Sequence, residues 1–304
     1  MITMSSISPY AELIRLNKTL GYCLNSCPYF VGLAYSALLS PTPISTTTLL
    51  KNFIVLTCWS ILLRWGGCAW NDIVDKDLDR QITRTKSRPL PRGAVTTSNA
   101  LVFTMAIFLC AILLLLLLPR PCMTEAAIIV FFGLLYPFGK QLFNYPQLIL
   151  TNIAWAVPMT MQSVEVDPLD HLVPTACLFL FIGTLIVMID VLYARQDIED
   201  DMKAGVKSMA VHFRHVINPL IHSLFLGSTG LLIAVGIFAG FGFPFFLLSV
   251  GGHFFGFRFL LATLKQEPSP SVERHAKLSV CSAIALLILG LIVENQTSPA
   301  SGKS

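Results

Sequence analysis

The sequence has few charged residues for its length. Only 12% of its 304 residues are Asp, Glu, Lys or Arg, whereas 54% are hydrophobic and the mean hydropathy is +0.70. Soluble globular domains carry about twice that charged fraction, so the composition excludes an ordinary soluble protein. The net charge of +4 is small, and no Lys/Arg run is interleaved with aromatic residues, which argues against a nucleic-acid partner.

Motifs of several other function classes are also missing. There is no GxxxxGK[ST] loop and no GxGxxG turn, so nucleotide binding by those routes is not expected. The eight cysteines are scattered, and Cys23 and Cys27 have no His or Cys neighbours, which favours packing over a zinc site or disulfides. No signal peptide or Arg-rich transit peptide is visible, so we expect the endoplasmic reticulum or another endomembrane rather than the mitochondrial inner membrane.

Long apolar runs account for most of the chain. A membrane-spanning helix needs about 20 apolar residues, and runs such as 113–118 lack the alternation of a membrane β-barrel. We therefore expect an all-α, polytopic membrane protein embedded in the lipid bilayer, with one transmembrane domain over 1–304. An amphipathic lead-in covers 1–18 and a short polar tail covers 295–304. About nine spans are predicted, at 20–40, 48–70, 97–118, 122–138, 146–163, 172–193, 215–240, 244–263 and 276–294.

Basic residues are concentrated in alternate connections between the predicted spans. The loops after the second, fourth, sixth and eighth spans carry most of them, including the run from Lys76 to Arg92. The loops after the odd-numbered spans are short and nearly free of Lys and Arg. The positive-inside rule then places the basic loops and the N-terminus in the cytosol.

Two short stretches hold nine of the 17 acidic residues. The first holds Asp72, Asp75, Asp77 and Asp79, and the second holds Asp190, Asp197, Glu199, Asp200 and Asp201. At about 100° per residue, a helix places Asp72, Asp75 and Asp79 on one face, with Asp77 turned away. The same geometry groups all the acids of the second stretch except Glu199 on one face, together with Tyr193.

Carboxylates stacked on one helical face repel each other, so positive groups must offset them. Three explanations are open: salt bridges to nearby Lys and Arg, an ion-coupled membrane carrier, or paired Mg²⁺ sites that also bind phosphate oxygens. A carrier should have acidic residues or broken helices at mid-span, and few are present. His253 and Arg258 lie in a glycine-rich apolar run and could belong to a carrier or acceptor site, although packing is favoured.

Both acidic stretches belong to longer patterns that include basic residues. The first stretch reads Asn71-Asp72-x-x-Asp75-x-x-x-Asp79-Arg80 and continues with Arg84-Thr85-x-x-Arg88-Pro89-Leu90-Pro91-x-Gly93. The second reads Asp190-x-x-Tyr193-Ala194-x-Gln196-Asp197-x-x-Asp200-Asp201 and continues with Lys203-x-Gly205-x-Lys207-Ser208. Together with Tyr136-Pro137-x-x-Lys140 and Arg15-x-x-Lys18, these patterns resemble the UbiA family of intramembrane prenyltransferases. The chain departs from the family at Gln141, where Arg is frequent, and at Thr19, where Pro is frequent.

This resemblance implies about nine transmembrane helices around a central cavity, with both motifs near its cytosolic mouth. It implies that Mg²⁺ binds an isoprenyl diphosphate, whose isoprenyl group then passes to an aromatic acceptor. The implied catalytic and metal-binding residues are Asp72, Asp75, Asp79, Asp197 and Asp201. The implied diphosphate contacts are Asn71, Arg80, Arg88, Lys140 and Lys207. Further substrate contacts are Arg64, Tyr193 and Asp190, and no protein partner is implied.

Within the family, the Tyr193-Ala194-x-Gln196-Asp197 form resembles fungal enzymes that prenylate polyketide-derived phenolic acids on the way to meroterpenoids. The expected donor is farnesyl diphosphate. The alternative is the 4-hydroxybenzoate polyprenyltransferase of ubiquinone biosynthesis.

Overall fold

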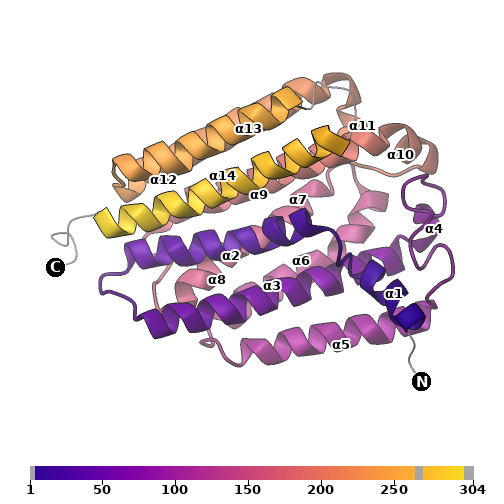
Figure 1. Ribbon diagram of the computed structural model, residues 1–304, viewed down its shortest axis with the longest axis horizontal. Helices are drawn as coiled ribbons and strands as arrows, with labels where there is room; N and C mark the ends of the chain where they lie inside the picture. Colours follow the sequence, from indigo (N-terminus) through magenta and orange to yellow (C-terminus); the bar gives the residue numbers. More distant parts are fainter. Residues whose placement is uncertain (1–3, 264–269, 298–304) are drawn as a thin grey trace.

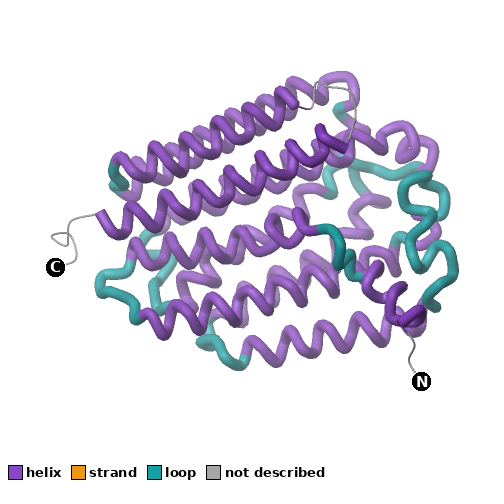
Figure 2. Tube along the Cα trace, in the orientation of Figure 1, coloured by secondary structure: helices purple, strands orange, loops and turns teal. Residues whose placement is uncertain are grey.

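A computed structural model describes residues 4–263 and 270–297 (Figure 1). Within these ranges the chain forms helices joined by loops, without strands, and most loops lie at the two ends of the helical bundle (Figure 2). The predicted all-α class is therefore confirmed. The helices are α1 (Met4–Leu13), α2 (Thr19–Leu39), α3 (Thr46–Val74), α4 (Lys76–Asp79), α5 (Thr97–Leu115), α6 (Cys122–Leu142), α7 (Gln147–Leu150), η1 (Thr151–Trp155), α8 (Ala156–Ser163), α9 (Leu172–Ala194), η2 (Arg195–Asp197), α10 (Ile198–Ala204), α11 (Met209–His212), η3 (Arg214–Val216), α12 (Ile217–Ala239), η4 (Phe245–Val250), α13 (Gly251–Thr263) and α14 (Pro270–Thr297).

Seven of the nine predicted spans coincide with segments that are long and apolar enough to cross a membrane. These are Thr46–Val74, Thr97–Leu115, Cys122–Leu142, Leu172–Ala204, Arg214–Ala239, Phe245–Ala262 and Arg274–Thr297, searched within the described residues. Helix α2 occupies the first predicted span but carries polar side chains such as Asn25 and Ser26. The fifth predicted span is broken into α7, η1 and α8. The count of nine spans is therefore confirmed for seven and stays a prediction for the other two.

Large apolar side chains face outward along the helices as well as inward. Val102 and Met105 of α5 and Ile237 and Phe238 of α12 are among the exposed ones. In water such surfaces would drive association, whereas lipid tails solvate them. With its seven apolar helices, the chain is an integral membrane protein.

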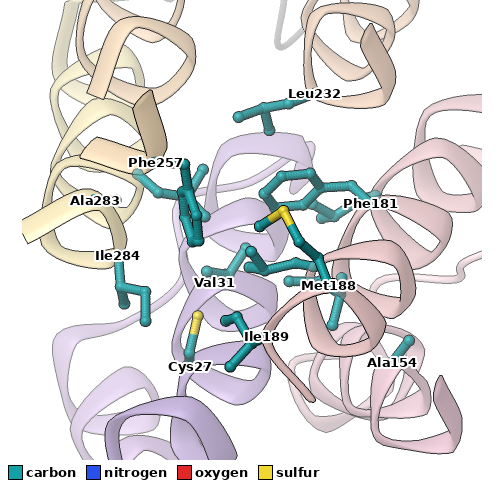
Figure 3. Close-up of a cluster of buried hydrophobic side chains, with 14 of the residues drawn as sticks. Cys27, Val31, Ala154, Phe181, Met188, Ile189, Leu232, Phe257, Ala283 and Ile284 are labelled. Atoms are coloured by element: carbon teal, nitrogen blue, oxygen red, sulfur yellow. The ribbon is translucent and has the colours of Figure 1, made fainter. Parts of the chain in front are cut away.

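The larger buried core joins the N-terminal helix α2 to the C-terminal half of the chain. Val31 of α2 lies near Phe181 and Met188 of α9, Leu232 of α12 and Phe257 of α13 (Figure 3). A second core around Trp59 packs α3 against α6 and α8. The two cores fix the long helices relative to one another, and the short elements α1, α4, α10 and α11 lie together at one end of the bundle (Figure 1).

His253 belongs to the larger core. Its Nε2 atom lies 3.0 Å from Ser228 Oγ, and its ring packs against Phe181 and Phe257. This arrangement supports the packing interpretation for His253. Arg258 lies exposed on α13, so packing does not explain it. The expected polar tail also begins late, because α14 continues to Thr297; residues 298–304 lie outside the described ranges.

Candidate active site

The first acidic motif lies where α3 ends and α4 begins. Asp72, Asp75 and Asp79 are buried, with 1%, 3% and 4% of their surface exposed. Asp77 points outward, with 85% of its side chain exposed. The helix breaks at Asp75 (φ −83°, ψ 3°), yet the helical hydrogen bonds from Asp75 N–H to Asn71 C=O and from Asp79 N–H to Asp75 C=O are kept, so the three buried carboxylates stay on one side.

Two arginines far apart in sequence bind the first and last of these carboxylates. Asp72 Oδ1 accepts hydrogen bonds from Arg15 Nη2 at 2.8 Å and from Arg88 Nη1 at 3.0 Å. Arg88 Nη1 also donates to Asp79 Oδ2 at 2.7 Å. Arg88 therefore offsets the mutual repulsion of two buried carboxylates. Burial raises the pKa of Asp79; the Arg88 guanidinium acts against that rise, and the charge of Asp72 adds to it.

Lys140, at the end of α6, binds the middle carboxylate. Lys140 Nζ donates to Asp75 Oδ2 at 2.6 Å and to Asn71 Oδ1 at 3.2 Å, and Asn71 Nδ2 donates to the same Asp75 oxygen at 3.0 Å. The ammonium also lies 5.0 Å from the Tyr136 ring centre, a cation–π distance. The other Asp75 oxygen, Oδ1, is buried without a hydrogen-bond partner. This carboxylate thus keeps one free acceptor inside the site.

Arg15 reaches the site because of how α1 ends. Arg15 N–H bonds to Glu12 C=O and Leu16 N–H bonds to Ala11 C=O, which is the Schellman arrangement of a helix C-terminus. Arg15 occupies its left-handed position (φ 53°), where glycine is usual. Arg92 also holds Glu12 through hydrogen bonds of 2.7 and 3.1 Å, and these lower the pKa of Glu12. The end of α1 is therefore joined to the loop that follows the first motif.

The second motif does not lie on one continuous helix. Helix α9 ends at Ala194, the 3₁₀ turn η2 follows, and α10 begins at Ile198. The predicted common face for Asp190 to Asp201 is therefore wrong, because the rotation per residue changes within the motif. Tyr193 is 45% exposed, whereas Asp201 is buried. Asp190 is half-buried and accepts a hydrogen bond from Gln147.

The loop 80–95, which follows the first motif in the sequence, contacts residues of the second motif. Its Arg84 guanidinium binds Asp197 through both carboxylate oxygens, at 2.6 to 3.0 Å, and the Thr83 N–H donates to Asp200 Oδ2 at 3.1 Å. The backbone after α10 is held as well, because Lys207 N–H donates to the Lys140 carbonyl at 2.8 Å. The structure thus brings the two acidic motifs to one site.

Two of the expected diphosphate contacts lie apart from the buried carboxylates. Arg80 pairs with the exposed Asp77 at 2.9 Å. The Lys207 ammonium is exposed and donates to the Leu142 carbonyl at 3.2 Å. Arg15 and Arg84 contact the motif carboxylates but were not among the expected site residues. Their signal was present in the Arg15-x-x-Lys18 and Arg84-Thr85 patterns.

Arg64 lies on α3 seven residues before Asn71, hence about two turns, or roughly 10 Å, further along the same face. Its guanidinium lies 4.9 Å from the centre of the Tyr22 ring, and Nη2 lies 3.5 Å from the Lys18 carbonyl. Its Nε atom is buried without a hydrogen-bond partner. Among the ion pairs of residues 4–263 and 270–297, none involves Arg64.

The carboxylates suit a divalent cation, although basic side chains bind them in this arrangement. Within the part of the chain that the structure describes, no three His, Cys, Asp or Glu side chains converge closely enough to hold a metal ion. Carboxylate oxygens are nevertheless the ligands that Mg²⁺ prefers, and the free Asp75 Oδ1 is such an oxygen. The donor set fits Mg²⁺ provided that the basic side chains transfer to another anion.

Together, the fold and this site define a helical membrane protein in which two acidic motifs and a set of Arg and Lys side chains meet at one end of the bundle (Figure 1). Residues 26–292 match the model of the UbiA prenyltransferase family, and the chain belongs to that family. It is therefore a prenyltransferase. Of the explanations considered for the acidic stretches, the enzyme is favoured over the ion-coupled carrier.

Curated fungal prenyltransferases are similar to this chain over nearly its whole length. It is 53% identical to the DMOA farnesyltransferase nvfB of Aspergillus novofumigatus, covering 95% of this chain and 92% of that protein. It is 52% identical to the polyprenyl transferase trt2 of Aspergillus terreus, covering 95% and 85%. Among solved structures, the apo UbiA homolog from Aeropyrum pernix K1 shares the fold, with a TM-score of 0.72 at 21% identity over 88% of this chain and 97% of that one. The UbiA homolog from Archaeoglobus fulgidus bound to GPP and Mg²⁺ has a TM-score of 0.65 at 14% identity, over 92% and 99%.

Proposed function

We propose that this chain transfers a farnesyl group from farnesyl diphosphate to a ring carbon of a polyketide-derived phenolic acid, as a step in meroterpenoid biosynthesis. Mg²⁺ is the proposed cofactor. The observation that carries this proposal is the set of buried carboxylates, each bound by a basic side chain, in a chain 53% identical to a DMOA farnesyltransferase. The fold neighbour with bound GPP and Mg²⁺ supports the choice of donor class and metal.

The residues divide into two roles in this proposal. Asp72, Asp75, Asp79, Asp197 and Asp201 would hold Mg²⁺, which when bound neutralises the diphosphate and favours its departure. Arg88, Lys140, Arg15 and Arg84 now bind those carboxylates and would turn to the diphosphate oxygens. Their fixed positive charges would stabilise the negative charge that grows on the leaving group as the bond to the isoprenyl carbon breaks. Asn71 accepts a hydrogen bond from Lys140 and donates one to Asp75, which keeps these two side chains together. Arg80 and Lys207 could join the diphosphate contacts only by leaving their present partners.

Arg64 is the proposed contact for the acceptor carboxylate. Its guanidinium has no acidic partner in the described ranges, and it lies on the same face of α3 as Asn71, about 10 Å deeper. In this proposal the guanidinium binds the carboxylate, and the aromatic ring lies between Arg64 and the bond that breaks. Tyr193 and Asp190 remain proposed substrate contacts without a specific role.

A crossed substrate assay tests this proposal. Membranes containing the protein and Mg²⁺ would be given geranyl, farnesyl or geranylgeranyl diphosphate, each with an orsellinic-type acid or 4-hydroxybenzoate. We expect the highest kcat/KM for farnesyl diphosphate with the orsellinic-type acid. A preference for 4-hydroxybenzoate would favour the ubiquinone-pathway alternative instead.

We further propose that the chain is one transmembrane domain of the endoplasmic reticulum, with both acidic motifs facing the cytosol. The concentration of Lys and Arg in the loops at the motif end supports this orientation. Protection of introduced cysteines in those loops from a membrane-impermeant thiol reagent in sealed microsomes would contradict it.

A further inference from the structure

Two residues at the start of α2 set the position of the Arg64 guanidinium. A Cβ atom added at Gly21 would collide with that guanidinium, so a larger residue at position 21 would displace it. Tyr22 supports the guanidinium with its ring, 4.9 Å from ring centre to Cζ. The Trp65 indole N–H in turn donates to the Tyr22 hydroxyl at 2.9 Å. The absence of a side chain at Gly21 leaves space for the Arg64 guanidinium. The Tyr22 ring, whose hydroxyl accepts the hydrogen bond from Trp65, forms one side of that space.

The electrostatics of this place are unfavourable for a cation alone. The guanidinium lies beside the N-terminus of α2, where Lys18 is the N-cap residue and supplies no side-chain hydrogen bond. A helix N-terminus carries partial positive charge, so it repels Arg64 and attracts an anion. The buried Nε atom without a partner adds an unused donor at the same place. Steric and cation–π contacts and one long hydrogen bond to the Lys18 carbonyl hold the guanidinium there, and the described ranges supply no acidic partner.

We propose that Gly21 and Tyr22 are positioning residues that make the enzyme selective for acceptors carrying a carboxylate. They act through Arg64, by keeping its guanidinium where the carboxylate of the phenolic acid binds. This inference rests on the proposed function. It assigns acceptor selectivity to the start of α2, outside both acidic motifs.

The test compares an orsellinic-type acid with the same phenol lacking the carboxyl group. Binding of each is measured as the concentration that half-saturates the thermal shift of the protein in detergent, which requires no turnover, and KM is measured for the acid and for farnesyl diphosphate. The variants are Gly21→Ala, Tyr22→Leu and Tyr22→Phe. Gly227→Ala is the matched control, because a Cβ at the exposed Gly227 of α12 meets no atom within 4 Å.

We expect Gly21→Ala and Tyr22→Leu to weaken binding of the acid on the order of tenfold, as for loss of one charged hydrogen bond. Binding of the phenol and KM for farnesyl diphosphate should stay unchanged. Tyr22→Phe keeps the ring face and should restore most of the affinity lost in Tyr22→Leu. Gly227→Ala should match the unmodified protein. Equal weakening for the acid and the phenol would overturn the inference, because a general packing defect does not distinguish them.

A double variant separates this inference from the proposed function. If Gly21 acts through Arg64, Gly21→Ala should have no further effect on acid binding in an Arg64→Gln background, whereas independent effects would multiply. Multiplied effects overturn the inference and leave the proposed acceptor contact in place. Unchanged acid binding in Arg64→Gln alone would overturn the acceptor contact itself, and the inference with it.

Discussion

The two acidic motifs of this prenyltransferase are held in different ways. Asp72 and Asp79 of the first motif are buried and bind Arg88, whose side chain is also largely buried. Asp197 of the second motif, with 13% of its side chain exposed, is bound through both oxygens by Arg84, whose side chain is 58% exposed. A buried ion pair is costly to break from one side, whereas an exposed pair contributes little to stability. The first motif is therefore part of the folded framework, and the second can rearrange without loss of the fold.

The largest effect should come from removing one carboxylate of each motif. Asp72→Ala and Asp197→Ala should each reduce prenyl transfer at least about 100-fold, because each removes a proposed metal ligand. Their stabilities should differ. Asp72→Ala leaves Arg15 and Arg88 without their shared anion and should destabilise the protein by about 3–5 kcal/mol, whereas Asp197→Ala should stay within about 1 kcal/mol.

Both variants would be compared by transfer assays in microsomes and by thermal unfolding in detergent. Mg²⁺-dependent transfer retained in both would contradict the metal assignment. Equal destabilisation of the two variants would contradict the difference between the motifs.

The next largest effect is expected from substituting the arginines that bind these carboxylates. Arg88→Gln should destabilise the protein by about 3 kcal/mol, because it leaves the buried Asp79 without a cation and Asp72 with Arg15 alone. Arg84→Gln should change stability by less than about 1 kcal/mol and lower transfer instead. Arg80→Gln is the control, since Arg80 and Asp77 form an exposed pair. Chemical denaturation measured by tryptophan fluorescence would rank the three, and similar values for Arg88→Gln and Arg80→Gln would be inconsistent with the burial argument.

Metal removal should lower the unfolding temperature of the ligand-bound protein. A ligand that binds only the folded protein raises its unfolding temperature, so adding Mg²⁺ with an unreactive diphosphate analogue should raise it by a few degrees. Chelation with EDTA should abolish both this shift and transfer. In Asp197→Ala the shift should largely disappear although the metal-free protein stays folded. A full shift in that variant would show that the second motif does not bind the metal.

The smallest expected effect is a stability difference between two substitutions of Arg15, which separates the role of its backbone conformation from that of its side chain. Arg15→Gly and Arg15→Ala both remove the contact to Asp72 and should reduce transfer similarly. Glycine adopts the left-handed conformation of position 15 without strain, so Arg15→Gly should be more stable than Arg15→Ala by about 1 kcal/mol. Thermal unfolding of the two variants measures this difference, and the reverse order would mean that α1 does not end as described.

The sequence alone was sufficient for the helical membrane class and for the inward face of the first motif. The spacing of Asp72, Asp75 and Asp79 needed only the helical repeat, which survives the short break at Asp75. The same reasoning failed for Asp190 to Asp201, because a 3₁₀ turn intervenes and no proline or glycine marks it in the sequence. Helical geometry is a local property, so it is predictable only while the helix continues.

Low charge and long apolar runs determined by themselves that this protein is an all-α membrane protein, because lipid accepts only backbones with internally satisfied hydrogen bonds. The concentration of acids in two stretches determined where its chemistry lies. Only the tertiary structure decided which cation binds which carboxylate. Arg15 and Asp72 are 57 residues apart, and Arg84 and Asp197 are 113 apart. Such pairs form only once the packed helices bring their ends together. No local sequence pattern predicts which residues pair across such separations in the chain.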